Sequence, residues 1–283
     1  GQTVTFKIQV TATSGPDTGV VEIPVTITGE NDAPTIVVGT ATTIAGGVKE
    51  DTGITTSGDI ATHGTITFQD FDLTDAHSAT VVLNSTASGL PHFVAGTEIG
   101  HFTIDPVAET LTDTNNQGTV GWHFTLDDDD PTLQSLAEGQ TITQTYTITI
   151  KDNNGVPVTQ TVTITITGTN DAPVLTADTA ASHHAEEVLN TTNSSVEDVV
   201  TGSLSFSDVD LSDTHSATAA LHPGAVVWSG GLYSGIPSAT LTALATAMNS
   251  SVTDSTGTGA GSVGWEFKVP DHLFDFLADG ETL

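Results

Sequence analysis

An internal repeat is the feature that most constrains what this 283-residue chain can fold into. Four sequence blocks return in the same order after nearly the same interval. The pairs are VTITGENDAPTIV at 25–37 with ITITGTNDAPVLT at 164–176, TITFQDFDLTDAHSAT at 65–80 with SLSFSDVDLSDTHSAT at 203–218, TVGWHF at 119–124 with SVGWEF at 262–267, and LAEGQT at 136–141 with LADGET at 277–282. Such self-similarity predicts tandem copies of one structural unit.

The phase of the repeat predicts where each copy starts and stops. A copy runs from a Pro-containing linker, through the Asp-rich and Trp blocks, to two long strands and the next linker. We therefore expect residues 1–33 to be the last two strands of a preceding repeat. Residues 34–172 are expected to form a complete β-sandwich repeat, and residues 173–283 the next repeat without its last two strands. On this interpretation the chain is an internal part of a longer protein.

Alternation of apolar and polar residues with period two predicts the strands. The longest example is a hairpin around the turn at 152–155, with one apolar face made of Ile142, Tyr146, Ile148, Ile150, Val162, Ile164 and Ile166. The N-terminal segment repeats it with Val4, Phe6, Ile8, Val10, Val21, Ile23, Val25 and Ile27. Shorter strands are expected at 65–69, 78–83, 99–104 and 119–125, with a matching set in the next repeat. The predicted fold class is all-β, in tandem Greek-key β-sandwiches.

Two local features complete the expected fold. Residues 238–249 carry good helix formers with Leu241, Leu244 and Ala245 on one face, so a short helix is expected as an insertion in the last unit. Trp122 and Trp265 follow Gly within strands. We expect both indoles to anchor a core, since large aromatic side chains dominate burial in a small sandwich.

Charge excludes several classes of partner. The chain has 4 Lys and no Arg against 35 Asp plus Glu, a formal net charge of −31. Nucleic-acid binding needs a basic surface, and an anionic membrane would repel this one. With Cys at 0, disulfides and thiolate metal sites are absent, and no apolar run is long enough to span a membrane.

Repeated carboxylates indicate calcium. In an extended segment, residues i and i+2 point the same way, so both carboxylates of Asp-x-Asp face one site. Such a pair is unfavourable without a cation, and calcium prefers six to eight oxygen ligands. Three features recur: the linker Asn-Asp, an acidic pair after it, and the Asp-x-Asp block. The candidate ligands are Asn31, Asp32, Glu50, Asp51, Asp70, Asp72, Asp75, Asn170, Asp171, Glu186, Asp208, Asp210 and Asp213, with Glu187 or Glu197-Asp198 as alternatives for the second acidic pair.

Other polar residues have simpler interpretations. Isolated aspartates such as Asp17, Asp59 and Asp254 are expected to cap turns or face water, and the run 127–130 is interpreted as a solvated turn. His77 and His215 recur with the Asp-rich block. A zinc site is conceivable there, but a hydrogen-bonded structural histidine is favoured because no second histidine lies near either one.

No catalytic constellation is found. The chain has no nucleophile elbow, no zinc-protease HExxH motif, no phosphate loop and no cationic group suited to an oxyanion. Repetition of the carboxylates in every unit suits architecture better than a glycosidase acid–base pair across one cleft. We therefore predict that the protein is not an enzyme.

The blocks TGENDAP and TGTNDAP, DFDLTDAHSA and DVDLSDTHSA, and FDFLADGETL resemble the VCBS-type repeats of giant bacterial surface proteins and RTX-type adhesins. They also resemble the Ig/cadherin-like arrangement in which linker Asn-Asp and a neighbouring Asp-x-Asp share calcium. The resemblance implies a secreted protein at the bacterial cell surface that supports adhesion or biofilm formation. Asn31, Asp32, Asp70 and Asp72, with their copies, are then the calcium candidates.

Three hypotheses follow. The first is an extender array whose linkers are stiffened by calcium and whose partners are neighbouring repeats of the same chain. The second is a carbohydrate-binding adhesion module that uses Trp228 and Tyr233 on surface glycans. The third is a self-assembling fibre subunit, in which the N-terminal strands of one chain complete the last repeat of an identical chain.

Overall fold

The computed structural model describes residues 1–90, 93–110, 116–179, 183–189, 191–222 and 224–283. Strands dominate these residues and one α-helix is present, which confirms the all-β class. Contacts divide the chain into two compact units, Gly1–Ser88 with Val94–Asp128 and Ile142–Ile166, and Gly89–Phe93 with Asp129–Thr141 and Thr167–Leu283. The predicted repeat boundaries stay a prediction.

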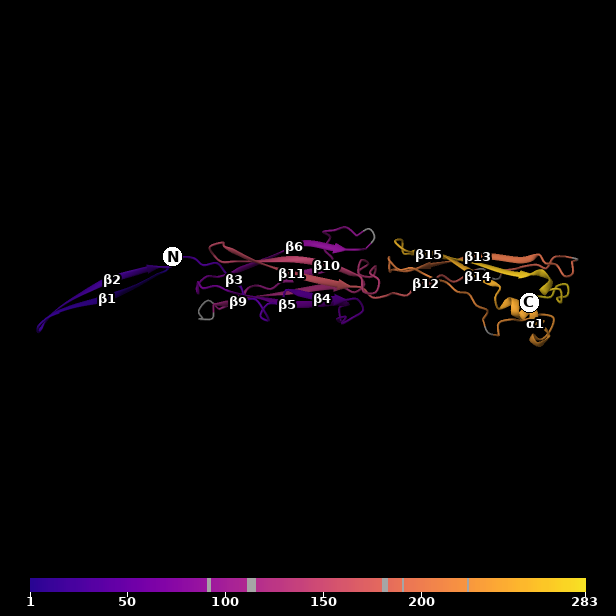
Figure 1. The fold of residues 1–283 in the computed structure, drawn as a ribbon, viewed down its shortest axis with the longest axis horizontal. Helices are drawn as coiled ribbons and strands as arrows, with labels where there is room; N and C mark the ends of the chain where they lie inside the picture. The colour runs from indigo at the N-terminus through magenta and orange to yellow at the C-terminus, as the bar shows by residue number, and fades with distance from the viewer. Residues whose placement is uncertain (91–92, 111–115, 180–182, 190, 223) are drawn as a thin grey trace. The chain divides into compact units, whose positions relative to one another are not determined.

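Two sheets form the first sandwich, defined here as the strands from β3 to β11 (Figure 1). One sheet has the order β3-β5-β9-β7 with β8 beside β9, and the other has the order β4-β11-β10-β6. The connections exchange between the two sheets, as in Greek-key sandwiches. The bounds are β3 Thr35–Ile36, β4 Ala45–Lys49, β5 Asp59–Gln69, β6 Ser78–Ser88, β7 His101–Ile104, β8 Ala108–Glu109, β9 Gln117–Asp127, β10 Thr141–Lys151 and β11 Pro157–Thr167. The strands predicted in this region are confirmed.

The core of the first sandwich lies between these sheets. Phe102 of β7 stacks on Trp122 of the same sheet at 5.6 Å between ring centroids, and on Tyr146 of the opposite sheet at 4.1 Å. Trp122 is fully buried, which confirms it as a core anchor, and its indole N–H donates to the Thr43 carbonyl at 2.9 Å. A Cβ on Gly64, its cross-strand neighbour, would overlap the indole, so glycine is required there.

The C-terminal unit, defined here as residues 173–283, has one sheet with the order β12-β13-β15-β14. Its elements are β12 Val174–Leu175, β13 Glu197–Ser207, β14 Met248–Thr253, β15 Ala260–Pro270, α1 Ser238–Leu244 and two 3-10 turns, Tyr233–Gly235 and Asp271–Leu273. The inserted helix is confirmed. The strand predicted to match 78–83 is wrong, because residues 216–221 are not in a strand. In the first sandwich the matching strand β6 pairs with β10, and among the described residues of the C-terminal unit no strand pairs with that segment.

The N-terminal hairpin is formed by β1 Thr3–Ser14 and β2 Asp17–Thr28. Its register runs without a break from Thr3 opposite Thr28 to Ser14 opposite Asp17, and none of the described residues adds a third strand to this sheet. The predicted apolar face is present but not buried: seven of its members are classed as exposed, namely Val4, Phe6, Ile8, Val10, Val21, Ile23 and Ile27.

Candidate functional site

The first Asp-rich block forms a tight turn directly after β5. The Asp72 backbone N–H donates to Asp70 Oδ1 at 2.9 Å, and the Asp75 N–H donates to the Asp72 carbonyl at 2.9 Å. The linker reaches this turn, because the Asp32 N–H donates to Asp72 Oδ2 at 2.7 Å. The structure therefore brings the predicted linker and Asp-x-Asp residues together.

The β10–β11 turn completes this cluster, which the sequence analysis missed. Asn31 Nδ2 donates to Asp152 Oδ2 at 2.9 Å, while Asn154 Nδ2 donates to Asp75 Oδ2 at 3.0 Å and also to Asn31 Oδ1. Burial raises the pKa of Asp75, and the nearby carboxylates Asp72, Asp70 and Asp152 raise it further. Burial also acts to raise the pKa of Asp152, but hydrogen bonds from Asn31 and backbone N–H groups outweigh it and lower that pKa.

The second Asp-rich block repeats this turn after β13. The Asp171 N–H donates to Asp210 Oδ2 at 2.7 Å, the Asp210 N–H to Asp208 Oδ1 at 2.9 Å, and the Asp213 N–H to the Asp210 carbonyl at 3.1 Å. Asn170 Nδ2 donates to the Asp171 carbonyl, as Asn31 does to that of Asp32. The same backbone scaffold thus holds the same carboxylates in both blocks.

Asp210 is the most perturbed member of this turn. Its side chain is buried, and Oδ1 has no hydrogen-bond partner. Burial raises the pKa of Asp210 to about 6; the Asp171 N–H opposes this, while the charges of Asp213, Asp171 and Asp208 add to it. A buried carboxylate oxygen without a partner is costly, so a bound cation would relieve it.

The two recurring histidines are hydrogen-bonded supports, as the sequence analysis favoured. His77 Nε2 lies 3.1 Å from Asp70 Oδ2 and its Nδ1 lies 2.7 Å from Glu109 Oε2. His215 repeats this with Asp208 at 2.7 Å and Asp254 at 2.8 Å. The hydrogen bond to Asp254, followed by that to Asp208, raises the pKa of His215. Asp254 is exposed and accepts the Ser255 N–H at 2.8 Å, as expected for a turn cap, and it holds His215 as well.

The acidic pair Glu50-Asp51 belongs to a different cluster. It lies where β5 begins, whereas Asp70 follows the end of β5, and an 11-residue strand separates the two by about 35 Å. Glu50 is buried, and the Asp51 N–H donates to Asp128 Oδ1 at 3.1 Å. Asp128 is also buried, so the interpretation of 127–130 as a solvated turn is wrong for this residue. The sequence could not separate these clusters because a strand places its two ends far apart.

The C-terminal unit has the equivalent cluster at the start of β13. Asp271 Oδ1 accepts the Val188 N–H at 2.6 Å and Asp275 Oδ2 accepts the Asn193 N–H at 2.8 Å. The other oxygens, Asp271 Oδ2 and Asp275 Oδ1, are buried without a partner. Burial first, and then the charge of Asp271, raises the pKa values of Glu187 and Asp198.

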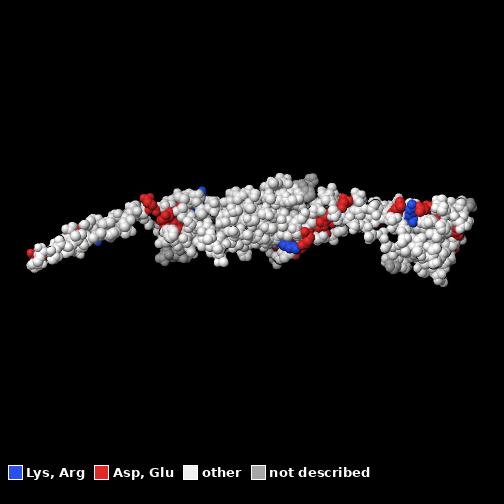
Figure 2. Space-filling model, viewed as in Figure 1, with Lys and Arg blue, Asp and Glu red and all other residues white. Residues whose placement is uncertain are grey.

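This arrangement draws one residue from each of the two alternative acidic pairs, and which of them bind calcium stays a prediction. Glu187 and Asp198 each contribute one carboxylate to the cluster around Asp271, although the sequence analysis placed them in separate pairs. Glu186 is exposed like Glu187, and Glu197 pairs with Lys268 at 2.5 Å. The visible face in Figure 2 shows Asp and Glu grouped in patches between wide uncharged areas.

The described residues do not contain three or more His, Asp or Glu side chains already spaced to hold a metal ion. Whether these side chains fit a cation depends on the chemistry of their donor atoms. Both linker clusters offer only oxygen donors and amides, they concentrate like charges, and one carries the partnerless Asp210 Oδ1. These properties suit calcium, whose coordination is flexible, and a bound ion would draw the carboxylates together.

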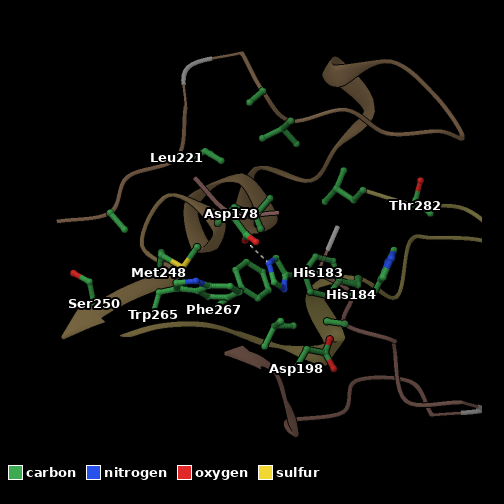
Figure 3. A pocket seen from close by; sticks show the side chains of 18 of the residues that line it. Asp178, His183, His184, Asp198, Leu221, Met248, Ser250, Trp265, Phe267 and Thr282 are labelled. Carbon is green, nitrogen blue, oxygen red and sulfur yellow. Dashed lines mark hydrogen bonds and ion pairs between the residues drawn. The ribbon is translucent and has the colours of Figure 1, made fainter. Parts of the chain in front are cut away.

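A second candidate site is an open apolar groove in the C-terminal unit, with a cavity of about 1560 Å³. One whole face of the sheet lines it, including Leu204 of β13, Met248 of β14, and Trp265 and Phe267 of β15 (Figure 3). His183 packs edge-on against Trp265 with ring centroids 4.6 Å apart and is held by Asp178 at 2.7 Å. Trp265 is only half-buried, so its predicted role as a core anchor is incomplete here.

The aromatic pair suggested for sugar binding is also described. Tyr233 is 57% exposed, while Trp228 is half-buried, packs edge-on against Phe276 and donates its indole N–H to Glu281 Oε2 at 3.1 Å. The polar edge of Trp228 is therefore already engaged within the chain.

Comparison with known proteins finds distant structural likeness only. No protein-family model and no curated protein matches the chain. Among solved structures, the CooA pilin subunit from enterotoxigenic Escherichia coli aligns with a TM-score of 0.34 and 7% identity, over 48% of this chain and 99% of the pilin chain. Zebrafish RET cadherin-like domains 1 to 4 align with a TM-score of 0.28 and 12% identity, over 96% of this chain and 52% of that one. Scores this low carry no argument about function.

No described helix is long and apolar enough to cross a membrane.

Proposed function

We propose that this chain is a non-catalytic, structural segment of a secreted bacterial surface adhesin or filament, in which tandem β-sandwich repeats act as extenders. Calcium at the inter-domain linkers stiffens the array, and neighbouring repeats of the same chain are its main partners. Adhesion or biofilm formation is the process that such an extender supports.

The observation that carries this proposal is the repetition of one carboxylate scaffold at both linkers. The linker N–H to Asp-x-Asp contact measures 2.7 Å in each copy, from Asp32 to Asp72 and from Asp171 to Asp210. A solvated acidic surface has no reason to repeat backbone contacts of this kind. Repetition at each linker is what an array needs if every junction is to have the same stiffness.

Calcium would be held by the carboxylates of each turn. In the C-terminal unit the donors are Asp171, Asp210 and Asp213. Asp208 contributes less, because its oxygens already accept the Asp210 N–H and contact His215. In the first sandwich, Asp32, Asp72 and Asp75 take the same roles. The ion would neutralise part of the −31 charge, which otherwise opposes a compact state.

Calorimetric melting with excess calcium, with magnesium and with a chelator tests the proposal. Saturating calcium is expected to raise the midpoint by at least about 5 °C, because a ligand at 100 times its dissociation constant contributes about 2.7 kcal/mol. Asp210→Asn is expected to abolish this gain in the C-terminal unit without lowering the chelated midpoint, since it removes a buried charge. Asp17→Asn, at an exposed position in β2, is the matched control and keeps the full response.

Small-angle scattering on the same samples measures the maximum dimension of the array, which depends on its stiffness. Chelation is expected to shorten the maximum dimension, because unneutralised linkers bend. Identical midpoints and identical dimensions with calcium and with chelator would refute the calcium-stiffened extender.

A carbohydrate-binding module is the second candidate, favoured by one observation: the exposed ring of Tyr233 follows a Trp in a loop that the first sandwich does not have. Stacking of a sugar ring on Tyr233 is the expected contact. A glycan array with wild type and Tyr233→Ala tests it. Binding that survives the substitution, or no binding at all, removes this candidate.

A further inference from the structure

Three histidines lie on the solvent face of the sheet β3-β5-β9-β7, on the side away from the core of the first sandwich. They are His63 in β5, His101 in β7 and His123 in β9, and all three side chains are exposed. Neither the calcium proposal nor the core uses them. Imidazole nitrogen is a preferred ligand of divalent transition metals, whereas calcium takes oxygen ligands.

His63 and His123 form a direct cross-strand pair. They lie opposite each other in the β5–β9 register, and their rings stack with centroids 6.1 Å apart at an interplanar angle of 30°. The Cβ atoms of directly opposed residues are about 4.5–5.5 Å apart, so both side chains leave the sheet from neighbouring points. Each ring can therefore turn a nitrogen toward the same volume of solvent above the two strands.

A carboxylate holds one ring of this pair. Asp105 follows β7, and its backbone N–H donates to the Gly121 carbonyl at 2.9 Å. Its Oδ2 lies 3.0 Å from His123 Nε2. A Cβ on Gly121 would overlap that same oxygen, so the glycine leaves the space that the carboxylate occupies. Metal-binding histidines are commonly supported in this way, because a carboxylate on one nitrogen fixes the ring and its tautomer.

The two rings keep nitrogens available for a metal ion. With Nε2 of His123 held by Asp105, Nδ1 is the nitrogen that presents a lone pair. His63 is exposed, and stacking engages the face of its ring rather than its nitrogens. Zinc binds nitrogen at about 2.0–2.1 Å, so two nitrogens on one tetrahedral ion lie about 3.3 Å apart. Directly opposed side chains can reach that spacing by rotation about their χ angles.

The fold itself does not require imidazoles at these positions. In the C-terminal unit the equivalent residues are Thr201 and Glu266, which lie opposite each other in the β13–β15 register. The same face of an equivalent sheet is therefore built without a histidine pair. The pair is specific to the first sandwich and is not part of the repeated scaffold.

Two protein ligands are enough for an exposed metal site. The described residues hold no group of three or more ligating side chains already spaced for a metal ion, and this pair does not need a third. Water can complete the coordination where a site is open to solvent, as it does at catalytic zinc sites. The net charge of −31 also raises the concentration of cations near the chain.

We propose that His63 and His123 bind one divalent transition-metal ion of the class that prefers imidazole, represented by Zn²⁺, on the exposed face of the first sandwich. Asp105 is a positioning residue that holds His123. The ion joins β5 to β9 and keeps open coordination positions toward solvent. This site shares no residue with the calcium clusters and does not depend on the proposed function.

Isothermal titration calorimetry with zinc chloride tests the proposal, on the full chain without a histidine tag and with excess calcium present. One zinc ion per chain is expected in the tightest step. His63→Gln and His123→Gln are each expected to abolish this step, and Asp105→Asn to weaken it about 10-fold. His101→Gln is the matched control on the same face. It is expected to change the affinity less than about threefold, because His101 is a diagonal neighbour of His123, about 7–8 Å away.

Diethyl pyrocarbonate labelling, followed by peptide mass spectrometry, locates the ion without any substitution. Zinc is expected to protect His63 and His123 from labelling and to leave His101 unprotected. Magnesium, which prefers oxygen ligands, is expected to protect none of them. The melting midpoint without metal is the folding control for every variant, since substitutions at exposed positions change stability little.

Asp210→Asn separates this site from the calcium proposal. The variant removes a carboxylate from a linker cluster and is expected to keep the full affinity for zinc. Failure of the calcium proposal therefore leaves the zinc site standing, and the reverse also holds.

Three results would overturn the proposal. A chain that binds no zinc has no such site. Zinc binding that survives both His63→Gln and His123→Gln belongs to another cluster. Equal loss of binding in His101→Gln, or labelling protection at His101 in place of the pair, would place the ligands elsewhere on this face.

Discussion

The hairpins β1–β2 and β10–β11 share one sequence pattern and have opposite environments. The seven residues of the predicted apolar face of β10 and β11, from Ile142 to Ile166, are at most 2% exposed, because a second sheet faces them across the core. Seven of the eight apolar residues in β1 and β2 are between 43% and 65% exposed. Strand pattern therefore decides that a hairpin forms, while burial depends on whether a complementary sheet lies opposite.

The equivalent sheet faces of the two units, on β5 and β9 in the first sandwich and on β13 and β15 in the C-terminal unit, show the same contrast in burial. Trp122 of β9 and Trp265 of β15 occupy equivalent registers, opposite Gly64 and Gly202. Trp122 is fully buried and Trp265 is half-buried. Since the local packing of indole over glycine is alike in both, the sheet β4-β11-β10-β6 that covers Trp122 accounts for the difference.

The largest expected effect concerns one position compared in both hairpins. Ile164→Ala in β11 is expected to lower the free energy of unfolding by about 3 kcal/mol, because it opens a cavity in a closed core. Val25→Ala, the equivalent change in β2, is expected to cost less than about 0.5 kcal/mol in the monomer. Urea denaturation of dilute samples measures both values. Equal costs would mean that β1–β2 is already packed against a partner.

A smaller effect is expected at the two tryptophans. Trp122→Phe is expected to destabilise the first sandwich by about 2 kcal/mol, since it leaves a cavity and removes the donor to Thr43. Trp265→Phe is expected to cost about 1 kcal/mol or less, because its ring faces an open groove. Acrylamide quenching, with the remaining tryptophans replaced by Phe, checks accessibility independently. Trp265 is expected to be quenched more strongly.

The smallest effect concerns Tyr146, whose pKa is raised above 10.0 by burial, with further contributions from the charge of Glu98 and a hydrogen bond to it. The unfolded chain loses this proton near pH 10 while the folded chain keeps it. The stabilisation is thus fully present below pH 10 and is lost as pH rises through the folded pKa. Absorbance titration of a Tyr233→Phe variant follows Tyr146 alone. Ordinary titration near pH 10 in the folded protein would contradict its burial.

Much of the fold follows from the sequence because strand alternation is local. The strands of the first sandwich, both long hairpins and the helix at 238–244 follow from periodicity and turn residues. The failure at 216–221 has a physical reason: a segment with strand pattern needs a partner edge, and that edge is not offered by the sheet of the C-terminal unit.

The candidate site was predictable to a lesser degree. The contacts from Asp32 to Asp72 and from Asp171 to Asp210 follow from a repeated motif beside a linker. The roles of Asp152 and Asn154 do not follow from it, because their turn is distant in sequence and only the sandwich returns it to the linker.

The sequence by itself determined the repeat, the all-β class, the excess of negative charge and the carboxylate spacing, because each is a property of composition or of neighbours along the chain. Only the tertiary structure decided which apolar faces are covered, because burial depends on what lies across the core. It also divided the acidic residues into clusters at opposite ends of a strand, with Asp70 at one end of β5 and Glu50 at the other. The length of β5 sets that separation, because a β-strand rises about 3.3 Å per residue.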